Sequence, residues 1–365
     1  MSDIKEKVKQ LVRTEVQALH AYGVADPGDL IKLDAMENPY PWPEHIKSLW
    51  LERLKLVDVN RYPDPVARNL KTRLREAMAI PSSQALLLGN GSDELIQMIL
   101  LALAKPGAKV MAPVPTFVMY EMTARFCGME FVGVPLNDED FSLDLDAMIS
   151  AIKLHDPAVI FLAYPNNPTG NLFNLADIEC VINAANGLVV VDEAYHAFAG
   201  QTFMDRLMDF ENVVVMRTVS KLGLAGLRLG VLVGPEAWLA EFDKVRLPYN
   251  INSLTQASVE FALANRVFLD EQTAAIQEQR TRLLREMSAI AGIHVWSSDA
   301  NFILFRVESA SATKLFDALR AAGILVKNLD KSGGVLQGCL RVTVGTPEEN
   351  GVFLSQLEKL LKQIA

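Results

Sequence analysis

The strongest constraint on the fold is a series of short apolar runs between residues 85 and 235, separated by segments with helical spacing. Several runs are almost continuously apolar and rich in β-branched residues, which is typical of strands buried on both faces under helices. The pattern predicts an α/β layer architecture with a mostly parallel, seven-stranded sheet. The predicted strands are ALLLG (85–89), KVMAPV (109–114), EFVGVPL (130–136), AVIFLAY (158–164), GLVVVDE (187–193), NVVVMRTVS (212–220) and RLGVLVG (228–234).

The C-terminal part of the chain has a different pattern. Residues 254–291 combine helical spacing with many charges, which predicts one or two long surface helices. Beyond them, shorter elements predict a smaller α+β domain, and residues 1–45 are expected to belong spatially to it. The expected division is a large domain of residues 46–275 and a small domain of residues 1–45 together with 276–365. Within the small domain, strands are expected at 301–307, 324–328 and 339–345, and helices at 313–323 and the C-terminus.

Composition excludes several classes of function. The 365-residue chain has a net charge of −9, which argues against a nucleic-acid partner because phosphate backbones are bound by clustered Lys and Arg. Its cysteines (Cys127, Cys180 and Cys339) are widely spaced, so neither a metal site nor a disulfide framework is expected. The charged N-terminus lacks the apolar stretch of a signal peptide, and the apolar segment 95–104 is too short to cross a bilayer. These features favour a cytoplasmic protein without a membrane partner.

Polar clusters follow three of the predicted strands. NNPTG (166–170) follows one strand, Asp192 ends the next, and Ser220 and Lys221 end a third. Open α/β sheets bind ligands beyond the carboxyl ends of their strands, so these clusters predict a single site.

Lys221 is the residue in this site with the most distinctive chemistry. A lysine at a strand end is usually a solvated loop residue, but this one is preceded by Ser220 and followed by Gly223, Gly226 and Arg228. The glycines let the backbone turn closely around an anion, and Ser and Arg supply phosphate donors. A lysine beside a cation in a pocket has a depressed pKa and condenses with carbonyls. The combination fits a phosphorylated cofactor that carries an aldehyde.

Asp192 has three interpretations. As a Walker-B acid it would need a G-x-x-x-x-G-K-[ST] loop, and the sequence contains no Gly-Lys dipeptide. It is then either a structural carboxylate or the partner of a cationic ring nitrogen. Pyridoxal phosphate needs such a partner, because a nearby carboxylate keeps its pyridine protonated.

Two further features carry alternatives. GNGSDE (89–94) matches a dinucleotide-binding G-x-G-x-x-G poorly, because Glu94 replaces the last glycine. A simpler interpretation is a helix N-terminus capped near Ser92, whose backbone amides face a phosphate or, equally, no ligand. Arg341, in CLRVTVG, is either a surface arginine or a forked clamp for a carboxylate or phosphate.

Taken in order, NNPTG, VDEAY, SKLGLAGLRLG and LRVTVGT resemble the motifs of fold-type I pyridoxal-phosphate aminotransferases. Among these, the chain is most similar to the histidinol-phosphate aminotransferase family, from ALHAY (18–22) to VGT (344–346). The resemblance implies a ping-pong Schiff-base reaction of histidine biosynthesis, which interconverts L-histidinol phosphate and 2-oxoglutarate with imidazole-acetol phosphate and L-glutamate. It also implies pyridoxal 5'-phosphate as cofactor and no metal.

The resemblance implies a cofactor role for each matching position. Lys221 would be the Schiff-base lysine and proton shuttle, and Asp192 would pair with the pyridine nitrogen. Asn167 and Tyr195 would hydrogen-bond the ring hydroxyl, so that Tyr195 joins Lys221 and Asp192 as a catalytic residue. Phe117 would stack on the ring, where the family commonly has tyrosine. The phosphate would be bound by Ser92, Asp93, Ser220, Arg228 and the partner subunit's Tyr62, which makes the active unit a homodimer.

On the substrate side, Tyr22 would contact the substrate phosphate, together with Asn167 and the main anion-binding residue, Arg341. Lys327 stands where a second arginine is often found and keeps the charge without the bidentate fork. Two departures from the family are a 221–228 loop that is one residue shorter and Met36 at a usually polar position. Neither is expected to touch the chemistry directly.

Several rival functions remain open. Within the fold they are an aromatic amino-acid aminotransferase and a threonine-phosphate decarboxylase. Outside it they are a Rossmann-type dehydrogenase or methyltransferase that uses GNGSDE, and a non-catalytic binding protein with a degenerate site.

Overall fold

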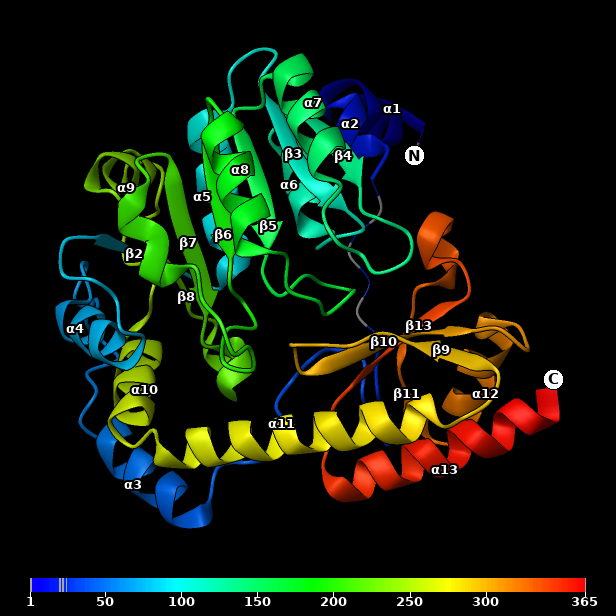
Figure 1. The fold of residues 1–365 in the computed structure, drawn as a ribbon. Helices are drawn as coiled ribbons and strands as arrows, with labels where there is room; N and C mark the ends of the chain where they lie inside the picture. Colours follow the sequence, from blue (N-terminus) through cyan, green and yellow to red (C-terminus); the bar gives the residue numbers. More distant parts are fainter. Residues whose placement is uncertain (1, 20, 22, 24, 365) are drawn as a thin grey trace.

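The computed structural model describes residues 2–19, 21, 23 and 25–364. This part of the chain contains a large sheet with helices on both faces, beside a smaller antiparallel sheet (Figure 1). The long helix α11 (Val267–Ser288) runs beneath both (Figure 1). None of the described helices is long and apolar enough to span a membrane.

All seven predicted strands of the large sheet are confirmed, in the order β2-β8-β7-β6-β5-β3-β4. β8 is antiparallel to both of its neighbours, and the remaining pairs are parallel. The sheet is therefore mostly parallel, as the near-continuous apolar runs predict. The bounds are β2 Ala85–Gly89, β3 Lys109–Val114, β4 Glu130–Pro135, β5 Val159–Ala163, β6 Leu188–Asp192, β7 Val213–Thr218 and β8 Gly230–Gly234.

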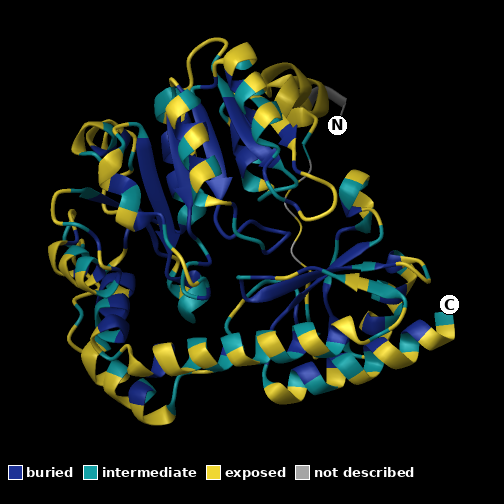
Figure 2. Cartoon of the chain, viewed as in Figure 1, coloured by how far each residue is buried: buried dark blue, intermediate teal, exposed yellow. Residues whose placement is uncertain are grey.

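Each central strand is buried on both faces because alternate side chains join different cores. In β5, Phe161 packs into a core with α5, α6 and α9, and Leu162 packs into the opposite core with α4, α7 and α8. Figure 2 shows these strands as a continuous buried layer under helices that are exposed on their outer sides. The helices are α4 Arg68–Ala77, α5 Ser92–Leu103, α6 Met119–Phe126, α7 Leu145–His155, α8 Leu175–Ala184 and α9 Glu236–Asp243.

The smaller sheet has the order β12-β13-β10-β9 and packs against α11, α12 and α13. The predicted single strand at 324–328 is wrong. The chain divides there into β11, which pairs with β1 in a separate two-stranded sheet, and β12, which pairs with β13. β9 was not predicted. The bounds are β1 Ile31–Lys32, β9 Ile293–Val295, β10 Phe302–Val307, α12 Ala312–Ala321, β11 Ile324–Leu325, β12 Lys327–Asn328, β13 Cys339–Thr343 and α13 Pro347–Ile364.

The helical segment 254–291 forms α10 (Ser253–Ala264) and α11. Only α11 is a surface helix. α10 buries one side, including Val259 and Ala262, because it packs against α4 and against α3 (Glu44–Leu54). Charge density therefore identified the exposed helix and misassigned its neighbour.

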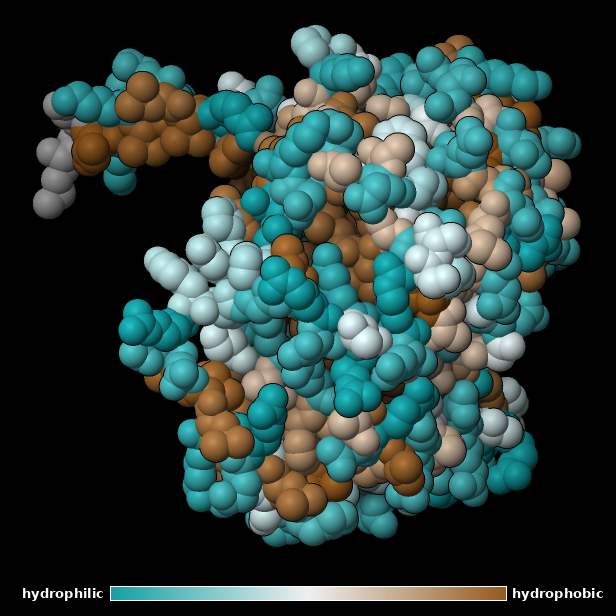
Figure 3. Space-filling model, turned by 90° about the vertical axis from the view of Figure 1, so that its left-hand side faces the viewer, coloured by the Kyte–Doolittle hydropathy of each residue, from teal (hydrophilic) through white to brown (hydrophobic). Residues whose placement is uncertain are grey.

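The N-terminal segment contacts both parts of the structure. β1 lies beside β11, whereas α2 (Thr14–Gln17) packs on α6 of the large sheet. α1 (Ser2–Leu11) stands out from the body and carries apolar surface that includes exposed Ile4 and Val8 (Figures 1 and 3).

Candidate active site

The carboxyl ends of β5, β6 and β7 meet at a pocket that encloses about 560 Å³ of empty space, its open mouth included. The structure thus brings together the three strand-end clusters expected to form one site. The predicted residues that line the pocket are Ser92, Asp93, Phe117, Asn167, Asp192, Tyr195, Ser220, Lys221 and Arg228.

Lys221 lies in the short 3₁₀ turn Ser220–Leu222 that follows β7. Its Nζ donates to the backbone carbonyl of Ala35 at 3.4 Å and lies 5.6 Å from the centre of the Tyr195 ring. Burial lowers the pKa of Lys221 to about 8, and the positive charge of Arg341 is the next largest cause. The amine is therefore more readily deprotonated, and so more nucleophilic, than an ordinary lysine.

Asp192 ends β6 and is almost completely buried. One carboxylate oxygen accepts from the Tyr120 hydroxyl at 2.7 Å, and the other accepts from the Ala194 amide at 3.1 Å. Burial raises the pKa of Asp192 to about 6, although both hydrogen bonds lower it. A carboxylate so placed gains strongly from a cation in the pocket.

Tyr120 is a pocket residue that the sequence analysis missed. It is fully buried on α6, stacks on Phe161 with ring centroids 4.6 Å apart, and meets Phe117 edge to face at 5.6 Å. Phe117 lies just before α6 and Tyr120 lies in its first turn, so the two rings are close in the sequence as well as in space. This closeness to Phe117 was the sequence signal that could have identified Tyr120.

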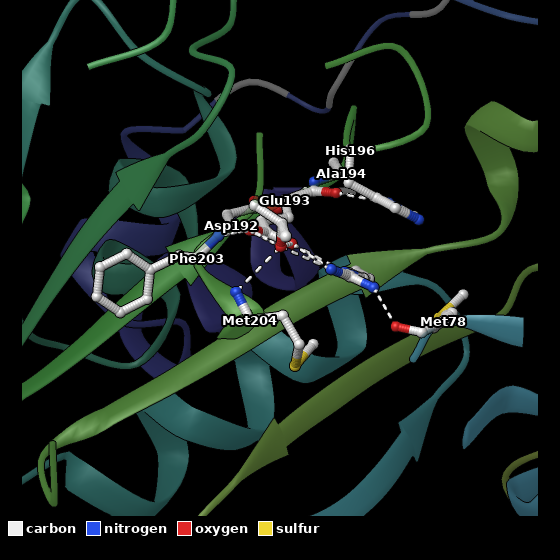
Figure 4. A network of polar contacts seen from close by, with 9 residues as sticks. Met78, Asp192, Glu193, Ala194, His196, Phe203 and Met204 are labelled. Atoms are coloured by element: carbon white, nitrogen blue, oxygen red, sulfur yellow. Dashed lines mark hydrogen bonds and ion pairs between the residues drawn. The ribbon is translucent and has the colours of Figure 1, made fainter. Parts of the chain in front are cut away.

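Behind Asp192, the neighbouring Glu193 is fully buried and surrounded by donors (Figure 4). Arg217 of β7 forms an ion pair with it at 2.8 Å, and the Thr202 hydroxyl also donates to it at 2.8 Å. Arg217 further donates to the Met78 carbonyl at 2.9 Å. This cluster, which we call the Glu193–Arg217 pair, ties the ends of β6 and β7 together directly behind the pocket.

The N-terminus of α5 forms another wall. The helix begins at Ser92, slightly earlier than a cap near Ser92 would place it, because its N-cap is Gly91 with φ 86°, and no side chain caps it. Ser92 therefore does not have the capping role that the sequence suggested. A Cβ on Gly91 would lie 2.5 Å from the guanidinium of Arg228, so only glycine allows this approach. Glu94 turns back instead and accepts from the Asn90 amide at 2.6 Å.

Arg228 contacts Asp93 at 3.3 Å, and both side chains remain about half exposed. On the far side of the Lys221 turn, the Thr218 hydroxyl accepts from the Ser220 amide at 3.1 Å and fixes the start of the turn. The first amides of α5, two serines and an arginine thus converge on one side of the pocket. Such an arrangement attracts an anion.

The two asparagines of the NNPTG motif have different roles: one fixes the loop and the other lines the pocket. Asn166 is fully buried and donates to the Pro115 carbonyl at 2.9 Å, which fixes the loop. Asn167 lines the pocket and accepts a hydrogen bond from Arg341. Arg341 is buried, so the surface-arginine interpretation is wrong. Lys327 lies directly opposite Arg341 in the β12–β13 register but does not line the pocket.

The chain segment Asp34–Met36 contacts two of the predicted site residues. The carbonyl of Asp34 accepts from Arg341 at 3.0 Å, and the carbonyl of Ala35 accepts from Lys221. Met36 lines the pocket. The expectation that Met36 lies away from the chemistry is therefore wrong, because the N-terminal segment folds back between the two sheets.

Among the predicted site residues that the structure describes, Tyr62, Lys327 and Arg341 do not line this pocket. Tyr22 lies outside the described residues. Tyr62 is 81% exposed and stacks on Tyr249, with ring centroids 4.3 Å apart. A larger hollow of about 1050 Å³ between α4, β2 and α9 includes Tyr249, but no described residue of the predicted site lines it. The described residues also contain no group of three His, Cys, Asp or Glu side chains that could hold a metal ion.

Comparison with known families defines the class of protein. A sequence model of the family "Aminotransferase class I and II" matches residues 28–357. The chain therefore belongs to the class I and II aminotransferases. This confirms the class that the motifs resemble.

Individual relatives identify the family within this class. The chain is 57% identical to histidinol-phosphate aminotransferase 2 of Nitrosococcus oceani, over 97% of this chain and 98% of the relative. It is 53% identical to histidinol-phosphate aminotransferase 2 of Cupriavidus pinatubonensis, over 95% of each. Within the class, the chain is a member of the histidinol-phosphate aminotransferase family.

Solved structures agree with the fold. The histidinol-phosphate aminotransferase of Clostridium acetobutylicum is 25% identical and superimposes with a TM-score of 0.84, over 92% of this chain and all of the other. That of Sinorhizobium meliloti, solved in complex with pyridoxal-5'-phosphate, is 24% identical with a TM-score of 0.85, over 97% and 98% of the two chains. The predicted fold-type I architecture is confirmed.

Proposed function

We propose that this protein is the histidinol-phosphate aminotransferase of histidine biosynthesis and that it uses pyridoxal 5'-phosphate. It exchanges the amino group of L-histidinol phosphate with 2-oxoglutarate, giving imidazole-acetol phosphate and L-glutamate. The observation that carries the proposal is the pocket itself. It combines a lysine whose pKa is lowered to about 8 with a buried carboxylate and an anion-binding helix N-terminus.

The donor set fits this cofactor part by part. The amides at the start of α5, with Ser92, Ser220 and Arg228, suit its phosphate. Asp192 suits its ring nitrogen, because a cation there offsets the cost of burying the carboxylate. Phe117 offers an aromatic face to the ring, and Asn167 and Tyr195 suit the ring hydroxyl.

The bound cofactor supplies an aldehyde that accepts the amino group and a ring that withdraws electrons from the adjacent carbon. With the cofactor bound, Lys221 Nζ would hold it, and the same amine would carry the proton between the α-carbon of the substrate and the cofactor. Its lowered pKa keeps a useful fraction of the amine free for this task near neutral pH. Asp192 keeps the opposite end of the ring protonated, and the Glu193–Arg217 pair holds Asp192 in place.

Both substrates carry an anionic group that the same arginine can bind. Arg341 clamps the phosphate of histidinol phosphate in one half of the reaction and a carboxylate of glutamate in the other. Asn167 orients the Arg341 guanidinium, and Lys327 adds a second positive charge from the neighbouring strand. Tyr22 is assigned to the substrate phosphate from the family resemblance alone.

The dimer, the domains and the location also belong to the proposal. The exposure of Tyr62 leaves its hydroxyl accessible, so that it can serve the phosphate site of a second copy. We divide the chain into residues 46–275 and residues 1–45 with 276–365, and we assign the protein to the cytoplasm with other biosynthetic enzymes.

The first test is the covalent link. The holoenzyme is expected to show a visible absorption band that borohydride abolishes, with the reduced label on the peptide that contains Lys221. Lys221→Ala should lose both the band and turnover, whereas Lys153→Ala, at an exposed lysine of α7, should keep both. A dehydrogenase, a methyltransferase or a non-catalytic binding protein would show no such band.

The second test is the substrate. Turnover is measured with histidinol phosphate, phenylalanine and threonine phosphate as alternative substrates, with detection of both amino transfer and carbon dioxide. Histidinol phosphate is expected to be the preferred substrate. Preferred turnover of phenylalanine would establish an aromatic aminotransferase, and release of carbon dioxide from threonine phosphate would establish a decarboxylase.

A further inference from the structure

Met36 has an unusual backbone conformation. Its φ is 53°, in the left-handed region that glycine and asparagine adopt more readily than methionine. Hydrogen bonds hold it there on both sides: the Met36 amide donates to the Thr343 hydroxyl at 3.0 Å, and its carbonyl accepts from Asn301 at 3.0 Å. Strained backbone of this kind clusters at functional sites, so it motivates the search for a task of Met36 in the pocket.

The position of Met36 indicates what that task is. It directly follows the two residues whose carbonyls contact Arg341 and Lys221, so it lies beside the groups assigned to the substrate anion and to the reacting carbon. Its side chain is half-buried and lines the pocket together with Phe117 and Tyr195. Unlike the charged and amide groups nearby, it offers only apolar, polarisable surface.

The two amino substrates differ in one arm. Both carry an amine and an anionic group for Arg341, but histidinol phosphate has a flat imidazole where glutamate has a second carboxylate. A thioether packs favourably against an aromatic ring and offers nothing to a carboxylate. We propose that Met36 is a specificity-determining residue that contacts the ring-bearing arm of the amino substrate. This inference rests on the proposed function.

The test compares the two half-reactions of the holoenzyme in three variants. Met36→Asn and Met36→Gly accept the backbone conformation and remove the apolar side chain. They are expected to lower kcat/KM for histidinol phosphate about 5- to 10-fold and to change kcat/KM for glutamate by less than about twofold. Met36→Leu keeps apolar bulk without sulfur and should lose about two- to threefold with histidinol phosphate. Met208→Asn, at an exposed methionine, controls for the substitution itself.

The outcomes separate the possible roles. Equal losses with both substrates, especially with a lower temperature of unfolding, would show that Met36 only packs against the core and would overturn the inference. No loss with either substrate would overturn it as well. If the wild-type enzyme forms the borohydride-sensitive band but does not turn over histidinol phosphate, the substrate assignment fails, and the inference fails with it.

Discussion

The two walls of the pocket are built in different ways. The strand-end wall, at β6 and β7, consists of Asp192, Thr218, Ser220 and Lys221, which directly end or follow strands of one sheet. Opposite it lies a set of contacts that we call the closing wall: Met36 lines the pocket, and Arg341, which does not line it, binds the segment just before Met36. Its central contact, from Arg341 to the Asp34 carbonyl, links residues 307 positions apart in the sequence.

The walls also differ in how they are held. Behind the strand-end wall, the Glu193–Arg217 pair is almost completely buried, with 0% and 5% of the two side chains exposed. The closing wall depends on hydrogen bonds from Arg341 and Lys221 to backbone carbonyls of one crossing segment. We expect the first wall to be rigid before any ligand binds and the second to adjust to the two different substrates. Three experiments test this contrast.

The largest effect is expected at the Glu193–Arg217 pair. Glu193→Gln leaves the Arg217 guanidinium buried without a counter-charge, and breaking a buried pair in this way costs about 3–5 kcal/mol. The double variant Glu193→Gln/Arg217→Met should cost less than the sum of the single changes, because it removes both charges. The free energy of unfolding in urea measures all three variants.

The matched control is the pair Arg228–Asp93 at the rim, whose side chains are 50% and 44% exposed. Asp93→Asn should change the free energy of unfolding by only about 0–1 kcal/mol. Comparable losses at both pairs would mean that the strand-end wall is no more firmly held than the rim, and the contrast would fail.

The strand-end wall is also the part that could be predicted from the sequence. Apolar runs identify buried strands, and parallel strands end at one edge, so Asn167, Asp192 and Lys221 had to lie close together. Each cluster is contiguous, and its chemistry can be recognised without knowledge of distant contacts. The same local reasoning placed a helix N-terminus near Ser92, although the cap is Gly91.

The closing wall could not be predicted in this way. Nothing in the residues around Met36 indicates that their carbonyls meet Arg341 and Lys221, because those contacts depend on how the N-terminal segment folds back between the sheets. The division of 324–328 into two strands has the same origin. β11 pairs with β1, and the two strands lie almost 300 residues apart in the sequence.

An intermediate effect is expected at Tyr120, which supports the strand-end wall from α6. Tyr120→Phe removes the hydrogen bond that stabilises the ionised form of Asp192, so the pKa of Asp192 should rise further above about 6. The loss of a hydrogen bond to a charged group corresponds to roughly one pKa unit. Cofactor affinity should fall as the pH drops through the pKa of Asp192, because the neutral acid no longer attracts the ring cation. The pH at the midpoint of this fall in affinity should be higher in the variant.

The raised pKa of Asp192 also predicts how the stability of the cofactor-free protein depends on pH. The pKa of Asp192 is raised from its ordinary value of 3.8 to about 6, so the folded state holds a proton that the unfolded state releases between these values. Its contribution to stability is therefore present below about pH 4 and lost as the pH rises through about 6. The matched control is Tyr164→Phe, because the Tyr164 hydroxyl donates to Gln201 and not to Asp192. This variant should leave the midpoint of cofactor affinity unchanged. An unchanged midpoint in Tyr120→Phe would show that this hydrogen bond does not set the charge of Asp192.

The smallest effect is expected at Lys327, on the strand beside Arg341. Lys327 lies opposite Arg341 in antiparallel register, and such partners project from the same face of the sheet. Lysine offers the substrate anion a point charge, whereas arginine would offer a fork that matches a phosphate. Lys327→Arg should therefore lower the KM for histidinol phosphate about two- to fourfold, in the range of a partly exposed ion pair, with a smaller change for glutamate. Lys331→Arg, at an exposed lysine in the following turn, should change neither value. If Lys327→Arg raises the KM for both substrates, the added bulk does not fit, and the closing wall is as rigid as the strand-end wall.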